Sequence, residues 1–121
     1  MDIEEAREYC LSLPLTSEHF PLDENVLAFR VIDKIFAMVD LTDPKWFALK
    51  CDPNYALELR DKHWEITGAF HMNKKYWNQI DLFGELSDEL VKGLIRHSYA
   101  EVVKKMTKKI RTEHPELSKV S

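Results

Sequence analysis

The chain has 121 residues, a formal net charge of −4 and a calculated pI near 5.7. Hydrophobic residues make up 45% and charged residues 31%, which is typical of one globular domain and excludes a disordered or low-complexity chain. No apolar run approaches the roughly 18 residues of a membrane span, and the acidic start MDIEEAREYC is unlike a signal peptide. We therefore expect a cytoplasmic, monomeric domain with no membrane contact.

The charge is distributed unevenly along the sequence. Residues 1–60 sum to −6 and residues 61–121 to +2. The acidic total argues against a dedicated nucleic-acid binder, whose pI usually exceeds about 9. The basic second half still predicts a local positive field on one face.

The first half predicts a helix followed by a three-stranded meander. Asp2 and Glu5 have the spacing of a capping box, and Pro14 ends the helix. Strands are predicted at 26–31, 35–41 and 46–51, joined by short turns that favour antiparallel pairing. In the second strand, alternation places Ile35, Ala37 and Val39 on one face and Phe36, Met38 and Asp40 on the other.

The second half predicts two more helices around a further strand. Asp52 and Pro53 begin a helix that runs to about Lys62, and a strand follows at 76–82. Ser87 caps the longest helix, which is expected to end near Arg111. The element order predicts an α+β fold, a two-layer sandwich of an antiparallel sheet with helices on one face. We assign residues 1–111 to a single domain and expect 112–121 to be a polar, frayed tail.

Catalytic and metal-binding motifs are missing from the sequence. No two of the five histidines have the i, i+4 spacing of a helical metal pair, and there is no CxxC or HExxH. Cys10 and Cys51 fall on apolar faces, where a thiol is inert. There is no GxSxG elbow or glycine-rich phosphate loop. We predict that the chain is not an enzyme and needs no metal or cofactor.

Two basic segments are candidates for nucleic-acid contact. Residues 70–78 interleave aromatic, amide and lysine side chains, and the candidates there are Asn73, Lys74, Lys75 and Trp77. The last helix supplies Lys104, Lys108 and Arg111. The alternative is structural: Trp77 belongs to the core, Lys74 and Lys75 form a solvated turn, and the helix cations complement the macrodipole.

The ordered series of segments resembles the MmcQ/YjbR family over about residues 1–111. The likeness is sharpest at GAFHMNKKYWN, residues 68–78. It is also carried by YCLSLP at 9–14, FP at 20–21, KIFA at 34–37, LKCDP at 49–53, ALELR at 56–60 and SY at 98–99. The chain departs from the family pattern at Ile32-Asp33, where glycine is common, and at Ala69-Phe70, where tyrosine often precedes the histidine.

This resemblance implies a CyaY-like, frataxin-type fold and a DNA-binding, double-wing surface. It brings no established catalytic residue and no cofactor, and a shared fold does not transfer iron chemistry. The leading hypothesis is therefore weak DNA binding through the two basic segments.

Two alternatives stay open. The first is a protein-interaction module that uses the acidic first helix or an open sheet face centred on Trp46. The second is a metal-binding frataxin analogue with cations at Asp2, Glu4, Glu5 and Glu8.

Overall fold

The computed structural model describes residues 1–120 and contains a six-stranded antiparallel sheet with the strand order β1-β2-β3-β4-β6-β5. The strands are β1 Thr16–His19, β2 Val26–Val31, β3 Lys34–Asp40, β4 Trp46–Lys50, β5 Ile66–Gly68 and β6 Trp77–Asp81. The helices are α1 Ile3–Ser12, α2 Pro53–Lys62, α3 Asp88–Val103, α4 Lys108–Glu113 and the 3₁₀ helix η1 Pro115–Lys119.

Local capping chemistry determines where the first three helices begin. Asp2 Oδ1 accepts the Glu5 N–H at 2.9 Å, and Glu5 Oε1 accepts the Asp2 N–H at 3.2 Å, which completes the predicted capping box. Asp52 caps α2 with Pro53 in its first turn, and Ser87 caps α3. The predicted starts of these helices are confirmed.

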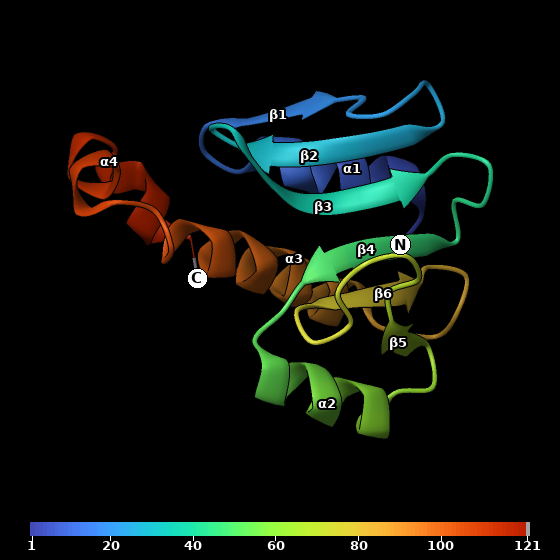
Figure 1. The fold of residues 1–121 in the computed structure, drawn as a ribbon. Helices are drawn as coiled ribbons and strands as arrows, with labels where there is room; N and C mark the ends of the chain where they lie inside the picture. The colour runs from blue at the N-terminus through green and yellow to red at the C-terminus, as the bar shows by residue number, and fades with distance from the viewer. Residues whose placement is uncertain (121) are drawn as a thin grey trace.

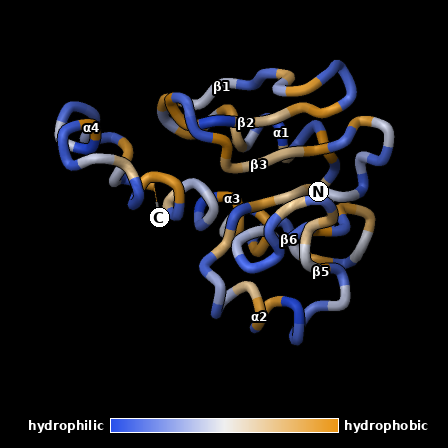
Figure 2. The backbone as a smooth tube through the Cα atoms, viewed as in Figure 1, coloured by the Kyte–Doolittle hydropathy of each residue, from blue (hydrophilic) through white to orange (hydrophobic). Residues whose placement is uncertain are grey.

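The helices and the sheet form two layers. α1 and α3 lie behind the sheet in Figure 1, and α2 lies beside the β5 edge. The core between the layers includes the row Leu27, Val39, Phe47 and Ile80 from four neighbouring strands, all 7% exposed or less. Figure 2 shows hydrophobic residues along these middle strands and mostly hydrophilic ones along α4. The predicted α+β two-layer sandwich is confirmed, while its CyaY-like character stays a prediction.

A β-bulge overturns the predicted face of Phe36 on β3. The register between β2 and β3 shifts at Phe29/Arg30, so strict alternation fails at this point. Alternation predicts Phe36 on the face opposite Ala37, but Phe36 is fully buried and packs edge-on against Tyr99 of α3, with ring centroids 5.6 Å apart. Phe36 and Ala37 therefore both belong to the core.

The C-terminal end also differs from expectation. The sequence predicts a last long helix that reaches Arg111, but α3 ends at Val103, and Thr107 begins a separate helix by accepting the Ile110 N–H. The tail from residue 112 is expected to fray, yet Leu117 of η1 is 1% exposed and belongs to the core cluster. Packing therefore continues past residue 111. None of the helices within residues 1–120 has the length and hydrophobicity that a bilayer crossing needs.

Candidate nucleic-acid interface

The two lysines of the loop before β6 make different local contacts. The Lys74 carbonyl accepts a hydrogen bond from Arg60 Nη2. The aliphatic stem of Lys74 lies against Gly68, where a methyl group in place of the glycine hydrogen would sit 3.0 Å from Lys74 Cδ. Lys75 Nζ instead lies 5.5 Å from the centroid of the Tyr76 ring. The backbone and stem of Lys74 thus help to hold the loop against its neighbours, while the side chains of Lys74 and Lys75 are both exposed.

Asn73 in this loop and Trp77 at the start of β6 both make local structural contacts. Asn73 Oδ1 accepts the Lys75 N–H at 3.1 Å, and the Asn73 carbonyl accepts the N–H groups of Tyr76 and Trp77. Trp77 is half-buried on β6 and lies opposite Lys50 of β4. The side chain of Asn73 is therefore engaged in a local Asx turn.

The two basic segments meet at one aromatic ring. Lys105 Nζ lies 5.0 Å from the Tyr76 ring centroid, so Lys75 and Lys105, 30 positions apart in sequence, contact the same side chain. Each ammonium group is attracted to the electron-rich ring face. The loop before β6 and the segment after α3 therefore lie on one side of the molecule.

A groove of about 500 Å³ extends this positive region toward the β2–β3 hairpin. Lys34, Lys50 and Lys105 line it together with apolar side chains from the α3–α4 junction. Burial and then the charge of Lys105 lower the pKa of Lys50, while Glu101 opposes that shift. We call Lys34, Lys50, Lys75 and Lys105 the basic cluster. Lys105 repels Lys50 within this cluster, and an anion beside the two would relieve that repulsion, although Asp33 adds one carboxylate to the groove.

The other predicted lysine and arginine side chains of the C-terminal segment lie outside the lining of this groove. Lys104 forms an ion pair with Glu101 at 2.7 Å, and this hydrogen bond raises the pKa of Lys104. Lys108 and Arg111 are exposed on α4, which projects beyond the sheet in Figure 1. Sequence reasoning missed Lys34 and Lys50 as site residues, because only the pairing of the strands brings their side chains to the same end of the sheet.

The sheet face opposite the helices carries a second groove, of about 490 Å³. We call it the open-face groove. Its floor includes Met38, Trp46 and Ala48, and the loops before β2 and β6 add Leu22 and Phe70. The interaction-module hypothesis expected an open face centred on Trp46, and the structure gives Trp46 a half-buried position in this groove.

Unpaired polar atoms occur on this same face. Gln79 Oε1 accepts the Phe70 N–H at 3.3 Å, while Gln79 Nε2 is buried without a hydrogen-bond partner among residues 1–120. His19 Nδ1 is the other buried unpaired side-chain atom found in that range. His19 lies opposite Ala28, and Gln79 lies opposite Ala48. The pairing of the strands between them places these two pairs in one row across the sheet. Each such group costs about 1–3 kcal/mol, so the row calls for an explanation.

Comparisons with known proteins agree with this architecture. The YjbR family model matches residues 11–101. The chain belongs to the YjbR family. Its curated relatives include the uncharacterized Escherichia coli K12 protein YjbR, 31% identical over 104 residues that cover 85% of this chain and 88% of the relative. The uncharacterized protein YbdF of Escherichia coli O157:H7 is 30% identical over 107 residues, 88% of each chain.

Solved structures show the same fold as this YjbR-family chain. The Deinococcus radiodurans protein DR2400, which has the domain DUF419, superposes with a TM-score of 0.85 at 39% identity, over 93% of this chain and 86% of its own. A Pseudomonas syringae protein gives a TM-score of 0.69 at 26% identity, over 81% of this chain and 96% of its own.

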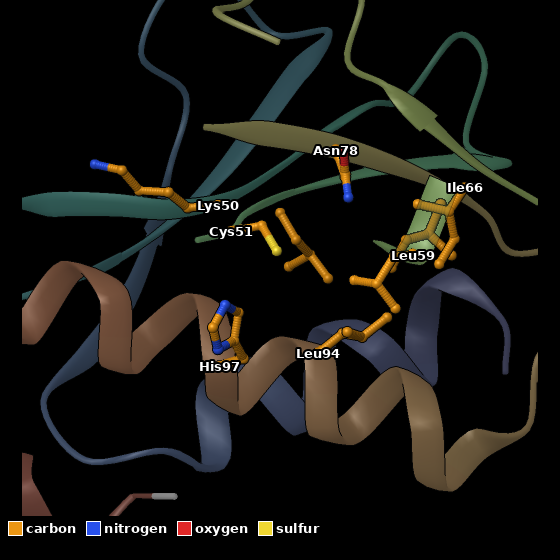
Figure 3. A pocket seen from close by; sticks show the side chains of 9 residues that line it. Lys50, Cys51, Leu59, Ile66, Asn78, Leu94 and His97 are labelled. Atoms are coloured by element: carbon orange, nitrogen blue, oxygen red, sulfur yellow. The ribbon is translucent and has the colours of Figure 1, made fainter. Parts of the chain in front are cut away.

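A third pocket, between sheet and helices, is too small to be a ligand site in this YjbR-family chain. It measures about 10 Å³, roughly the space of one water molecule. Figure 3 shows His97 and Leu94 on one side of it and Asn78 on the other, while the Lys50 side chain runs away from it. His97 Nε2 accepts the Asp52 N–H at 3.1 Å, and Asn78 Oδ1 accepts Arg60 Nε at 2.7 Å. These polar groups are used in packing.

Within the part of this YjbR-family chain that the structure describes, the thiols and acidic groups form no assembled reactive centre. Burial raises the pKa of the Cys10 thiol, and burial raises that of Cys51 to about 12, so both are protonated near neutral pH. Within residues 1–120, no group of three or more His, Cys, Asp or Glu side chains is arranged to hold a metal ion. The metal-binding hypothesis for the first helix therefore finds no assembled site in this range. Two of its four proposed ligands, Asp2 and Glu5, take part in the capping box.

Proposed function

We propose that this YjbR-family chain binds nucleic acid weakly, through contacts between the basic cluster and backbone phosphates. The observation that carries the proposal is the convergence of Lys75 and Lys105 on the Tyr76 ring, beside the groove that Lys34 and Lys50 line. Lysines that neutralise phosphates release condensed counterions, which supplies most of the affinity of a non-specific binder. The acidic total charge agrees with weak rather than tight binding.

The proposed activity is binding and not catalysis. In support of this, both cysteines are buried with raised pKa values, and His97 is already an acceptor for a backbone N–H. Binding to phosphates needs only charge placed at the surface, which the basic cluster supplies. The cytoplasmic location and the monomeric state stay predictions.

Fluorescence anisotropy of labelled single- and double-stranded DNA at about 50 and 200 mM salt tests this proposal. Four phosphate contacts give a log–log salt slope of about −3.6 for duplex and −2.8 for single strands. Duplex affinity should therefore fall on the order of 100-fold between the two salt concentrations. No saturable binding at the lower salt with high-micromolar protein would refute the proposal.

A charge-matched pair of variants locates the contact. Lys50→Ala combined with Lys105→Ala should reduce the duplex slope by about 1.8, because two phosphate contacts are lost. The control is Lys45→Ala combined with Lys62→Ala, which removes the same charge at positions outside the basic cluster. This control should leave the salt slope of duplex binding unchanged. Lys45 comes directly before β4 and Lys50 is its last residue, so the two lysines lie at opposite ends of the strand. Equal slopes for the two double variants would contradict the assignment of the contact to the basic cluster.

A further inference from the structure

The open-face groove has the chemical character of a small-molecule site. A volume of about 490 Å³ falls within the range of ligand pockets, which are mainly apolar with a few placed polar groups. Its apolar walls contain two aromatic rings, Trp46 and Phe70, and two methionines, Met38 and Met72. Rings and thioethers pack well against a planar aromatic body. The walls therefore favour a flat, unsaturated ligand over a sugar or a metal ion.

Gln79 supplies the groove with a hydrogen-bond donor. Its side chain lines the groove and is 5% exposed. Oε1 accepts the Phe70 N–H, whereas Nε2 has no partner within residues 1–120 and is the group that a ligand would satisfy. A buried amide donor without an acceptor is uncommon. A ligand that places an acceptor against Nε2, with a small shift of the surrounding side chains, would satisfy it.

Two carboxylates give the groove its charge preference. Asp40 and Asp43 are among its lining residues, and both are exposed. Asp40 Oδ1 already accepts the N–H and the Oγ1–H of Thr42, which leaves Asp40 Oδ2 for a ligand. Carboxylates accept hydrogen bonds and repel anions. The groove therefore favours a neutral or cationic ligand that carries a donor such as an amino group, and it disfavours free phosphates and carboxylates.

We infer that the open-face groove binds an amino-bearing planar heterocycle of the cytosine or adenine type, with a ring acceptor at Gln79 Nε2 and the exocyclic amino group toward Asp40 and Asp43. Such a heterocycle could come from a free nucleoside or from an unstacked base of a nucleic-acid strand. The inference does not require the proposed function, because a free nucleoside has no phosphate and makes no use of the basic cluster.

Titration with cytidine and uridine tests the inference, because these nucleosides differ at the exocyclic group that faces the carboxylates and at ring N3, which accepts a hydrogen bond in cytidine and donates one in uridine. The probes are the ¹H–¹⁵N resonances of the Gln79 side-chain amide and the Trp46 indole. Cytidine at low millimolar concentration should shift both resonances saturably and bind about tenfold more tightly than uridine. No shift of either resonance, or equal binding of the two nucleosides, would overturn the inference.

Three variants assign the contacts. Gln79→Met keeps the side-chain length and removes the donor, and it should weaken cytidine binding about tenfold. Ala48→Leu fills the floor of the groove and should abolish binding even if Gln79→Met fails to fold. Asp43→Asn should reduce the preference for cytidine over uridine, because an amide can donate to the uracil carbonyl. Asp61→Asn makes the same charge change on α2 and should leave the preference intact. Unchanged cytidine affinity in Ala48→Leu would overturn the inference.

An oligonucleotide arm distinguishes the two sources of the heterocycle. If a strand supplies the base, oligo(dC) should bind more tightly than cytidine, and the Lys50→Ala/Lys105→Ala variant should remove that advantage. If the ligand is a free nucleoside, cytidine should bind, and oligo(dC) should bind no more tightly than cytidine. The second result would contradict the proposed function and leave the inference about the groove standing.

Discussion

The Ser98 hydroxyl of α3 accepts a hydrogen bond from the Lys50 backbone N–H at 2.9 Å, just where β4 ends. The same hydroxyl donates to the carbonyl of Phe36 on β3, and Ser98 is fully buried. One side chain thus joins the long helix to two strands. It also fixes the backbone that carries the Lys50 ammonium group into the basic cluster.

Replacing Ser98 with alanine should destabilise the fold by about 2 kcal/mol. The substitution leaves the Lys50 N–H and the Phe36 carbonyl without partners in a buried environment. Urea denaturation measures the free energy of unfolding. Ser12→Ala, which removes an exposed hydroxyl bonded to the Tyr9 carbonyl, serves as the control and should change stability by less than about 0.5 kcal/mol. Equal effects of the two substitutions would contradict the role assigned to Ser98.

Stability should fall as the pH drops below about 6.5, the ordinary pKa of histidine. Burial lowers the pKa of His97, whereas Glu101 and Asp52 act to raise it and Lys104 to lower it. The unfolded chain therefore binds a proton at a higher pH than the folded chain does. Neutral His97 contributes its full stabilisation above the pKa that it has in the unfolded chain. This stabilisation is lost as the pH falls from that pKa toward the lower pKa of His97 in the folded chain.

Thermal melting of the wild type and of His97→Gln between pH 7.5 and 5 measures the contribution of His97 to this decline. The variant keeps a polar side chain but does not titrate, so its decline should be shallower. Parallel curves would show that other groups account for the pH dependence.

Two glycines should respond to alanine with opposite signs. At Gly84 a Cβ would lie 2.5 Å from Glu65 Cγ, and Glu65 is buried with its carboxylate accepting the Glu85 N–H at 3.0 Å. Gly84→Ala should cost about 1–3 kcal/mol. At Gly93 in α3 the nearest atom is 3.6 Å away, so Gly93→Ala should stabilise by roughly 0.5–1 kcal/mol. Denaturant unfolding measures both effects, and a neutral Gly84→Ala would contradict the predicted contact.

The packed C-terminal turn should matter for stability. Leu117 is 1% exposed within the core cluster, so Leu117→Ala should cost about 2–5 kcal/mol. Leu57→Ala is the matched control, because Leu57 is 61% exposed on α2, and it should stay within about 0.5 kcal/mol of the wild type. If both variants unfold at the same denaturant concentration, η1 does not contribute to the core.

Local sequence signals predict where the helices begin. Most of the features that sequence reasoning misses depend on pairing between residues that are distant in the sequence. Capping at Asp2, Asp52 and Ser87 depends on neighbouring residues, so the sequence reveals it directly. β1 is missed because Thr16–His19 has no apolar alternation and is a strand only through its pairing with β2. The break after Val103 does have a signal, since Thr107 is a good N-cap residue.

The candidate interface could be predicted only in part. Lys75 is found from the density of basic and aromatic residues around it, whereas Lys34 and Lys50 need the strand pairing. Trp77 is expected at an exposed stacking position or in the core, and it is half-buried opposite Lys50. The open-face groove is not predicted, because loops that are distant in sequence build its walls.

The outermost strands of the sheet are both short, with four residues in β1 and three in β5. Short edges offer few free backbone groups to another chain and so protect against edge-to-edge aggregation. On β1, Glu18 is also tied to Arg7 of α1 by two hydrogen bonds of 2.7 Å, which places charge beside that edge. Polymerisation by strand addition is therefore disfavoured at both ends, and self-association of this chain at high concentration would have to use its faces.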